Sequence, residues 1–336
     1  MNKQIRAIFV MLMMCWCALS LGVNASDPKG SRNIIYVNDD NISGPWDGTT
    51  QHPYQYIQDA IDHAVTNDII YVANGTYYEH LYINSYLEGL TISQWINPDD
   101  LDTNRPTLVG NNTGTGIVID ASNVKITKLE ITNYGQQGRD AGIYIETDAN
   151  SVTIYDNIIV NAFQGIWIKR DLPKDTYHTI EKNAITNISS RGISMVLCDQ
   201  NKILSNNFTL CVFGVYLHDC YRNIISENMF SYNTEGLVID IGMENQIYLN
   251  TFTKNVYGLG IVGTRSSTIS KNNFINNTKE NAYFITFNVW NADIWTGNYW
   301  GKHVFPLMKP ITGILAFSKI SFPWLKFDFF PAQSMN

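Results

Sequence analysis

The chain has 336 residues and a formal net charge of −7, and only 16% of its residues are charged while 45% are hydrophobic. Asn, Thr, Ile, Gly and Tyr fill the difference, a mixture that favours strands and tight turns over long helices. The acidic balance argues against nucleic acid and against anionic membrane as partners. We expect an all-β protein.

Residues 1–25 have the pattern of a secretory signal peptide. Lys3 and Arg6 give a positive start, an apolar stretch follows as far as Gly22, and small residues end at Ala25. We expect cleavage near Ala25 and a secreted or extracytoplasmic mature protein, at the cell surface or in the periplasm. The alternative is an uncleaved anchor, although the run is short for a spanning helix. No membrane span is expected in the mature chain.

Residues 26–115 are expected to form an N-terminal cap and the first coils of a repeat structure. One short helix is predicted there from an amphipathic stripe, and it would cover the first coil as a lid. The stripe consists of Ile57, Ala60, Ile61, Ala64 and Val65.

A repeat of about 22 residues runs through residues 116–301. Glycines open successive units at Gly142, Gly165, Gly192, Gly214, Gly236 and Gly258. A second strand in each unit carries an inward Ile, an Asn three residues later and a bulky apolar residue two after the Asn. The Ile column is Ile126, Ile154, Ile180, Ile203, Ile225, Ile247 and Ile269. The Asn column is Asn157, Asn183, Asn206, Asn228, Asn250, Asn272 and Asn298. The bulky column is Ile131, Ile159, Ile185, Phe208, Phe230, Phe252, Phe274 and Trp300.

These columns predict a solenoid. Like residues at a constant offset stack if each repeat is one coil, with neighbouring coils separated by the strand spacing of about 4.8 Å. We therefore predict a single right-handed parallel β-helix of about eight to ten coils. Insertions at Gln136–Arg139 and Asp171–Asp175 interrupt the period. Insertions in solenoids form loops on one face, often the binding face.

Residues 302–336 lose the repeat and become apolar and aromatic. The segment contains Pro306, Pro310, Pro323 and Pro331. These prolines exclude a spanning helix there, so an irregular C-terminal apolar cap is expected.

The chain resembles a known group of proteins. Ile35-Tyr36-Val37-Asn38 and Ile70-Tyr71-Val72-Ala73-Asn74-Gly75-Thr76-Tyr77 look like the N-terminal cap of pectate-lyase-like β-helix proteins. The repeats and the closing Gly297-Asn298-Tyr299-Trp300-Gly301 are similar to the NosD-type group of carbohydrate-binding and sugar hydrolase proteins. The resemblance covers nearly the whole mature chain and implies a right-handed parallel β-helix. It does not fix a function, because one solenoid serves lyases, epimerases, hydrolases, adhesins and accessory proteins.

The outward face of the glycine-opened strands is the candidate site. The second and fourth residues after each Gly point outward there. They include Tyr144, Glu146, Trp167 and Lys169, which are candidates for substrate binding because sugar faces stack on aromatic rings and charges read hydroxyls or carboxylates. The expected partner is a polysaccharide or a cell-surface glycan. The alternative is an ordinary solvated sheet face.

Three further outward residues could carry catalysis. His218 and Asp240 should lie on adjacent coils, where the carboxylate would orient the imidazole, and Tyr216 shares the strand of His218. A His base with a Tyr acid suits β-elimination or C5-epimerisation of uronate polymers. The group that would neutralise the substrate carboxylate is missing, because Lys169 is expected to pair with Glu146.

No metal and no cofactor are expected. The fourth-position column lacks the stacked carboxylates of a calcium site, and the histidines are too scattered for copper. Cys198 and Cys220 should stack on adjacent coils, either as a disulfide or as two small hydrophobic residues. Glycosylation candidates are the sequons at Asn41, Asn74, Asn111, Asn187, Asn207 and Asn276.

Three functions stay open from the sequence. The first is a binder of carbohydrate or of a surface partner. The second is a polysaccharide lyase, C5-epimerase or glycoside hydrolase that uses the outward face, and the third is a structural surface or adhesin element. A cleft walled by the insertions would favour a binder or an enzyme, and a bare cylinder would favour the structural role.

Overall fold

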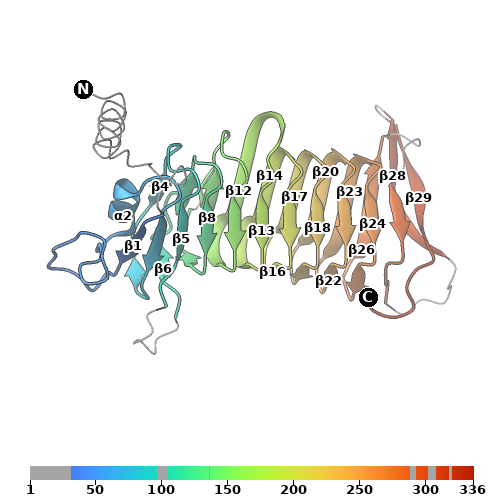
Figure 1. Cartoon of the computed structure of the whole chain (residues 1–336). Coiled ribbons are helices and arrows are strands. Elements are labelled where there is room, and N and C mark those ends of the chain that lie inside the picture. Colours follow the sequence, from blue (N-terminus) through green and yellow to red (C-terminus); the bar gives the residue numbers. More distant parts are fainter. Residues whose placement is uncertain (1–31, 97–103, 136, 288–292, 302–307, 318–319) are drawn as a thin grey trace, which may run out of the picture. The chain divides into compact units, whose positions relative to one another are not determined.

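Parallel strand pairing continues from the first strand to the last coil in the computed structural model of the chain. The structure describes residues 32–96, 104–135, 137–287, 293–301, 308–317 and 320–336. The predicted signal peptide lies outside these residues. Residues 33–336 form one unit, in which the strands wind into about nine turns of a right-handed β-helix (Figure 1). The predicted fold class is confirmed.

Each coil contributes to three parallel sheets. The sheet that carries the repeat glycines, here the Gly sheet, consists of β4 (Leu81–Ile83), β7 (Ile117–Ile119), β10 (Ala141–Ile145), the second part of β12 (Ile158–Asp175) and of β14 (Ala184–Asp199), β17 (Phe213–Tyr221), β20 (Glu235–Met243), β23 (Tyr257–Arg265), β26 (Glu280–Thr286) and β28 (Met308–Phe317).

The Ile sheet follows in each coil. It consists of β1 (Ile34–Val37), β2 (Ile69–Val72), β5 (Thr91–Gln94), β8 (Lys125–Thr127), β11 (Thr153–Tyr155), β13 (Thr179–Glu181), β15 (Lys202–Leu204), β18 (Ile224–Ser226), β21 (Gln246–Tyr248), β24 (Thr268–Ser270), β27 (Ile294–Thr296) and β29 (Ile320–Phe329). The Phe sheet closes the coil with β3 (Thr76–Tyr77), β6 (Thr107–Val109), β9 (Glu130–Thr132), the first parts of β12 and β14, β16 (Asn207–Thr209), β19 (Met229–Ser231), β22 (Thr251–Thr253) and β25 (Asn273–Ile275).

The predicted apolar columns form the core. Ile203, Ile225 and Ile247 are register partners on successive coils and are fully buried. In the Phe sheet the Phe230 ring stacks between Phe208 and Phe252, with ring centroids 4.9 and 4.8 Å away. Trp300 ends this column as predicted, 4.4 Å from the Phe274 ring. The predicted columns are confirmed.

The repeat glycines are required by the close approach of neighbouring coils. A Cβ atom placed on Gly214 would overlap the carbonyl oxygen of Gly236 on the next coil. The same clash recurs for Gly192 against Gly214. Gly therefore allows the backbones to approach closely at the start of each strand of the Gly sheet.

Asn ladders hold the corners of the coils. In the predicted column, Asn206 donates through its backbone N–H and its Nδ2 to Oδ1 of Asn228, at 2.8 and 3.0 Å, and Asn228 bonds Asn250 in the same way. The ladder between the Ile and Phe sheets is confirmed. Its amides satisfy corner backbone groups that the strands leave unpaired.

Two further ladders occupy the other two corners and were not predicted. Asn201, Asn223 and Asn245 bond in sequence between the Gly and Ile sheets. Asn233, Asn255 and Asn277 do so between the Phe and Gly sheets. Residues just before ladder positions adopt positive φ; they include Ser205, Arg222, Glu227, Tyr232 and Leu249. The ladders thus hold left-handed turns that L-residues adopt at a cost.

The predicted lid is a short helix, α2 (Ile57–His63), which packs against β1, β2 and β4 (Figure 1). Ile57, Ala60 and Ile61 are buried as predicted. The prediction that Val65 belongs to the apolar face of this helix was wrong, because the helix ends at His63 and Val65 is 55% exposed. No helix among the described residues is long and apolar enough to cross a membrane.

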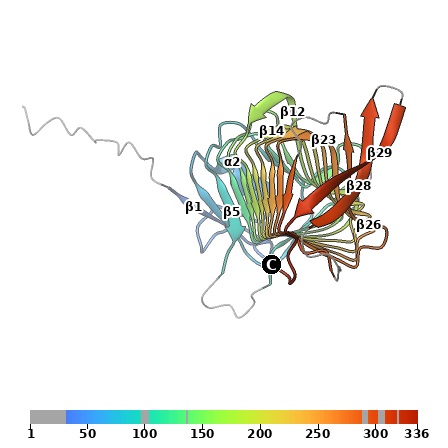
Figure 2. The same cartoon turned by 90° about the vertical axis from the view of Figure 1, so that its right-hand side faces the viewer.

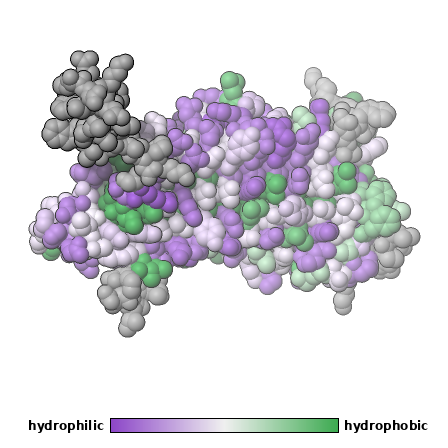
Figure 3. Space-filling view, viewed as in Figure 1, coloured by the Kyte–Doolittle hydropathy of each residue, from purple (hydrophilic) through white to green (hydrophobic). Residues whose placement is uncertain are grey.

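The C-terminal cap is more regular than predicted. β28 and β29 form an antiparallel hairpin, and Pro310 and Pro323 lie inside its strands. Proline is tolerated in such a position because a strand at the end of a sheet has backbone groups without sheet partners. Figure 2 shows the hairpin extending beyond the outline of the coils, and Figure 3 shows hydrophobic side chains at this end. Its exposed apolar residues include Ile320, Phe322, Trp324 and Leu325.

Candidate functional site

The predicted site residues lie on the outward face of the Gly sheet. Strand register aligns Tyr144 with Trp167, and Ser194 with Tyr216, in one outward column. The neighbouring column aligns Lys169, Val196, His218 and Asp240. The sheet therefore brings the candidates for binding and for catalysis onto one surface.

Tyr216, His218 and Asp240 form one hydrogen-bonded cluster. The alternation in β17 buries Val215 and Leu217 and turns Tyr216 and His218 outward. Asp240 of β20 accepts a hydrogen bond from the Tyr216 hydroxyl at 2.8 Å, and its same oxygen lies 3.0 Å from His218 Nδ1. The carboxylate fixes the orientation of both side chains and leaves Nε2 of the imidazole directed away from it.

Arg191 completes this cluster and was missed from the sequence. Its guanidinium lies 4.5 Å from the centre of the Tyr216 ring. Burial, followed by the hydrogen bond to Asp240, raises the pKa of Tyr216 to about 12. The phenol is therefore protonated at neutral pH. Arg191 stands two residues before the buried Ile193, so strand alternation would turn it inward, and the sequence pattern held no signal for it.

A cavity of about 310 Å³ opens beside the cluster. Lys169, Arg191 and His218 bring cationic or titratable nitrogen atoms to its wall, and Trp167 and Tyr216 bring rings. Gln164 also lines it and is 3% exposed. Gln164 Oε1 and Arg191 Nε are buried atoms with no hydrogen-bond partner among the described residues. The cavity is thus polar and partly cationic, and two polar atoms of its wall lack a hydrogen-bond partner among the described residues.

Trp167 is more buried than an exposed stacking platform would be. The side chain is 8% exposed, because the Tyr144 ring stacks on it at 4.8 Å and the Arg139 guanidinium lies 5.9 Å from its ring centre. Burial, followed by the nearby Glu146 carboxylate, raises the pKa of Tyr144 to about 12. Trp167 therefore supports the cavity wall and presents little free ring surface.

The expected ion pair between Glu146 and Lys169 is absent among the described residues, and Lys169 lines the cavity instead.

The two predicted insertions differ in their relation to the cavity. Gly138 of the first insertion lines the cavity, and its carbonyl accepts a hydrogen bond from Gln164 Nε2 at 3.2 Å. The second insertion lies within β12, where the register shifts between Lys169 and Lys174. None of the residues of this second insertion, Asp171–Asp175, lines the cavity.

Cys198 and Cys220 are free and buried, and they stack on adjacent coils. They therefore pack as two small hydrophobic residues and do not form a disulfide. Among the sequons, Asn111, Asn187, Asn207 and Asn276 are exposed, whereas Asn41 and Asn74 are half-buried. Asn41 Nδ2, the atom that a glycan would occupy, donates to the Pro53 carbonyl at 2.7 Å.

Comparisons with known proteins agree with this fold. The model of the family described as "Periplasmic copper-binding protein (NosD)" matches residues 61–304. An alginate lyase from Paenibacillus sp. str. FPU-7 has a similar structure, with a TM-score of 0.59 and 15% identity over 73% of this chain and 92% of the lyase. Tailspike protein 2 of Escherichia coli O157:H7 bacteriophage CAB120 is also similar, with a TM-score of 0.57 and 14% identity over 84% of this chain and 38% of the tailspike. No curated protein matches the chain. At these identities the structural likeness shows the fold alone.

The family description implies copper, and the described residues do not fit a copper site. No three His, Cys, Asp or Glu side chains gather within the described part of the chain in a way that could hold a metal ion. Copper sites need clustered imidazole, thiolate or thioether ligands. His178, the most buried of the described histidines, uses Nδ1 to accept a hydrogen bond from the Val152 N–H at 3.1 Å. We derive no chemistry through copper.

Proposed function

The chain belongs to the NosD family, which is described as periplasmic, and on that premise we propose that it is an extracytoplasmic protein that binds a uronate-containing polysaccharide. Residues 1–25 would direct export and would then be cleaved. The polysaccharide would lie on the outward face of the Gly sheet, and one sugar ring would enter the cavity beside Tyr216.

One observation carries this proposal: Lys169, Arg191 and His218 line the same cavity as two aromatic side chains. Hydrogen bonds from cationic groups to a carboxylate are about twice as strong as neutral ones, and the guanidinium can bind it with two N–H donors. The Tyr216 ring supplies apolar surface for a sugar face. Gln164 Oε1 has no partner among the described residues, so a ligand hydroxyl could satisfy it.

Binding of uronate oligosaccharides tests the proposal. The wild-type protein should bind oligoalginate or oligogalacturonate with an affinity that falls as salt is added, because the contacts are ionic. Lys169→Gln should lower the affinity about tenfold, since a hydrogen bond to a charged group contributes about 1.5–3 kcal/mol. Lys202→Gln is the matched control, because Lys202 is exposed on the Ile sheet. Equal affinities of the two variants, or no binding by the wild type, would refute the proposal.

A second function is favoured by the Tyr216–Asp240–His218 cluster. In a lyase, His218 Nε2 would take the proton from C5, the electron pair would form the C4–C5 double bond, and the C4–O bond would break. The leaving oxygen would then need a proton, and Tyr216 is protonated at neutral pH because its pKa is about 12. Arg191 or Lys169 would neutralise the uronate carboxylate. A C5-epimerase would use the same proton abstraction and return a proton to the other face.

Turnover separates an enzyme from a binder. His218→Ala should keep oligosaccharide binding within a few-fold and reduce turnover by roughly 10² or more if the imidazole is the base. Ultraviolet absorbance measures the unsaturated lyase product, and the ratio of uronate epimers measures epimerisation. Absence of both products with every uronate polymer that binds would leave binding as the function. A surface or adhesin role without a ligand would show neither binding nor turnover.

A further inference from the structure

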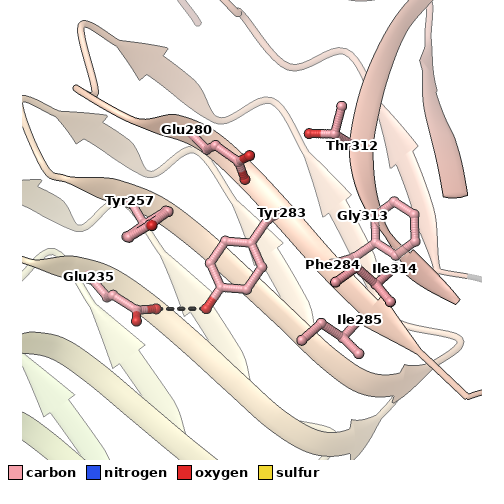
Figure 4. A pocket seen from close by; sticks show the side chains of 9 residues that line it. All are labelled: Glu235, Tyr257, Glu280, Tyr283, Phe284, Ile285, Thr312, Gly313 and Ile314. Carbon is pink, nitrogen blue, oxygen red and sulfur yellow. Dashed lines mark hydrogen bonds between the residues drawn. The ribbon is translucent and has the colours of Figure 1, made fainter. Parts of the chain in front are cut away.

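A second cavity lies further along the Gly sheet, where the last coils meet the hairpin. It has a volume of about 460 Å³. Glu235, Tyr257, Glu280 and Tyr283 form its polar side, and Ile314 of β28 contributes to its apolar side (Figure 4). None of these residues was singled out from the sequence, and the uronate cavity described above shares none of them.

We propose that this second cavity binds an uncharged pyranose unit of the same polysaccharide, with its ring against Tyr257 and Tyr283 and its hydroxyls donating to Glu235 and Glu280. The inference rests on the proposed function, because it extends that glycan along the same face. It also defines the polymer further, as one that contains both uronate and neutral sugars.

The two tyrosine rings make adjoining walls. Their centroids are 5.6 Å apart and their planes meet at 74°. The Tyr283 hydroxyl donates to Glu235 at 2.8 Å, as the dashed line in Figure 4 shows. This reach depends on Gly260, the register partner of Tyr283 on the intervening strand β23, because a Cβ atom there would lie 2.5 Å from the Tyr283 oxygen. The glycine leaves room for the phenol to lie across β23.

The charge of this cavity differs from that of the first. Register places Glu235, Tyr257 and Glu280 in one column, so the two glutamates flank the tyrosine. Carboxylates accept hydrogen bonds from sugar hydroxyls and repel a uronate carboxylate. Lys279 lies 5.4 Å from the centre of the Tyr257 ring and balances part of this charge. The first cavity, which Lys169 and Arg191 line, has the opposite preference.

The two cavities are close enough for one oligosaccharide. Tyr216 and Tyr283 belong to the same outward column, with Val238 and Gly260 between them. Three strand spacings correspond to about 14 Å along the solenoid axis. A glycan that lies parallel to this axis would therefore contact the cationic cavity with one unit and the tyrosine cavity with another.

Binding measurements with two classes of probe test the proposal. An array of neutral and uronate-containing oligosaccharides is first bound to the wild-type protein, and affinities are then measured by calorimetry. Tyr257→Ala should weaken neutral oligosaccharides about tenfold, which corresponds to about 1.4 kcal/mol. Glu280→Gln should weaken them roughly three- to tenfold, the range of one hydrogen bond.

Tyr232→Ala is the matched control. Like Tyr257, Tyr232 has a lysine over its ring, because Lys254 lies 5.0 Å from the ring centre. It lies at the corner after the Phe sheet, however, and lines neither cavity. Circular dichroism and the Tm check that each variant is folded. Equal neutral-sugar affinities of the folded Tyr232 and Tyr257 variants, or no neutral glycan retained by the wild type, would overturn the inference.

The same data separate the two proposals. Weakened uronate binding in Lys169→Gln with unchanged neutral binding supports two distinct cavities. If the wild type retains neutral but no uronate oligosaccharides, the proposed function fails while the tyrosine cavity stands as a neutral-sugar site. If it retains uronates alone, the further inference fails and the proposed function stands.

Discussion

Replacing Asn206 with Ala would interrupt the Asn ladder in the middle of the solenoid. Asn206 is 1% exposed. Its Nδ2 donates to the Ile180 carbonyl at 2.8 Å and to Asn228 Oδ1 at 3.0 Å. Its Oδ1 accepts from the backbone N–H and from Nδ2 of Asn183, both at 2.9 Å. The side chain therefore joins three coils.

The cost follows from these bonds. Asn206→Ala removes every bond that the amide makes and leaves the Asn183 backbone N–H without its acceptor in a buried corner. Each lost bond costs about 1 kcal/mol net, and an orphaned buried donor costs about 1–3 kcal/mol. Three bonds at about 1 kcal/mol each and the orphaned donor together lower the free energy of unfolding by about 4–6 kcal/mol. Because solenoid stability is close to a sum over neighbouring coils, the loss should be concentrated around this one.

Asn207→Ala is the matched control. Asn207 is the next residue and is exposed, and its side chain accepts one hydrogen bond among the described residues, from the Thr209 hydroxyl at 3.2 Å. A change within about 0.5 kcal/mol is expected there. Urea denaturation measures both variants, and amide hydrogen exchange should show lost protection at Asn183 in the Asn206 variant alone. Equal stabilities of the two variants would refute the view that the ladder holds the coils together.

Three further predictions follow from burial. Phe230→Ala should cost about 3–5 kcal/mol in chemical denaturation, because the ring is fully buried between two others; a loss under 1 kcal/mol would contradict the stacked column. Burial and the nearby Arg170 lower the pKa of His178 to about 3, below its unfolded value of about 6.5. Its contribution to stability is therefore complete above pH ~6.5 and declines on acidification towards pH ~3, by a total on the order of 5 kcal/mol. An unchanged pH profile of stability in His178→Asn would refute this. Burial raises the pKa of the Cys198 and Cys211 thiols to about 12, so iodoacetamide at pH ~8 should label these residues only after unfolding; mass spectrometry of native and denatured protein compares the two states.

The corners show how far the sequence could be taken. The Asn column at Asn206 and Asn228 was predicted from its constant offset. The ladders through Asn223 and Asn233 follow the same logic, since these residues stand five positions before and after Asn228. The signal was present in the sequence for all three corners.

The hairpin shows the opposite case. Residues 308–329 lack the repeat, and their prolines argue against regular structure by local rules. Their strand pairing depends on the open end of the last coil, where β26 and β27 offer backbone groups to β28 and β29. Local propensity does not contain this partner, so the sequence predicted an apolar cap at this end but not its hairpin.

The sequence by itself determined the coil, because a period of about 22 residues combined with strand alternation settles which side chains point inward and which point outward. It also brought His218 beside Asp240, since they are one repeat apart. Only the tertiary structure decided how much of each outward side chain reaches solvent. Arg139 comes from an insertion and covers Trp167, and Gly260 clears a path for Tyr283. Such exposure depends on neighbours from other coils and loops, and no periodicity within one repeat encodes them.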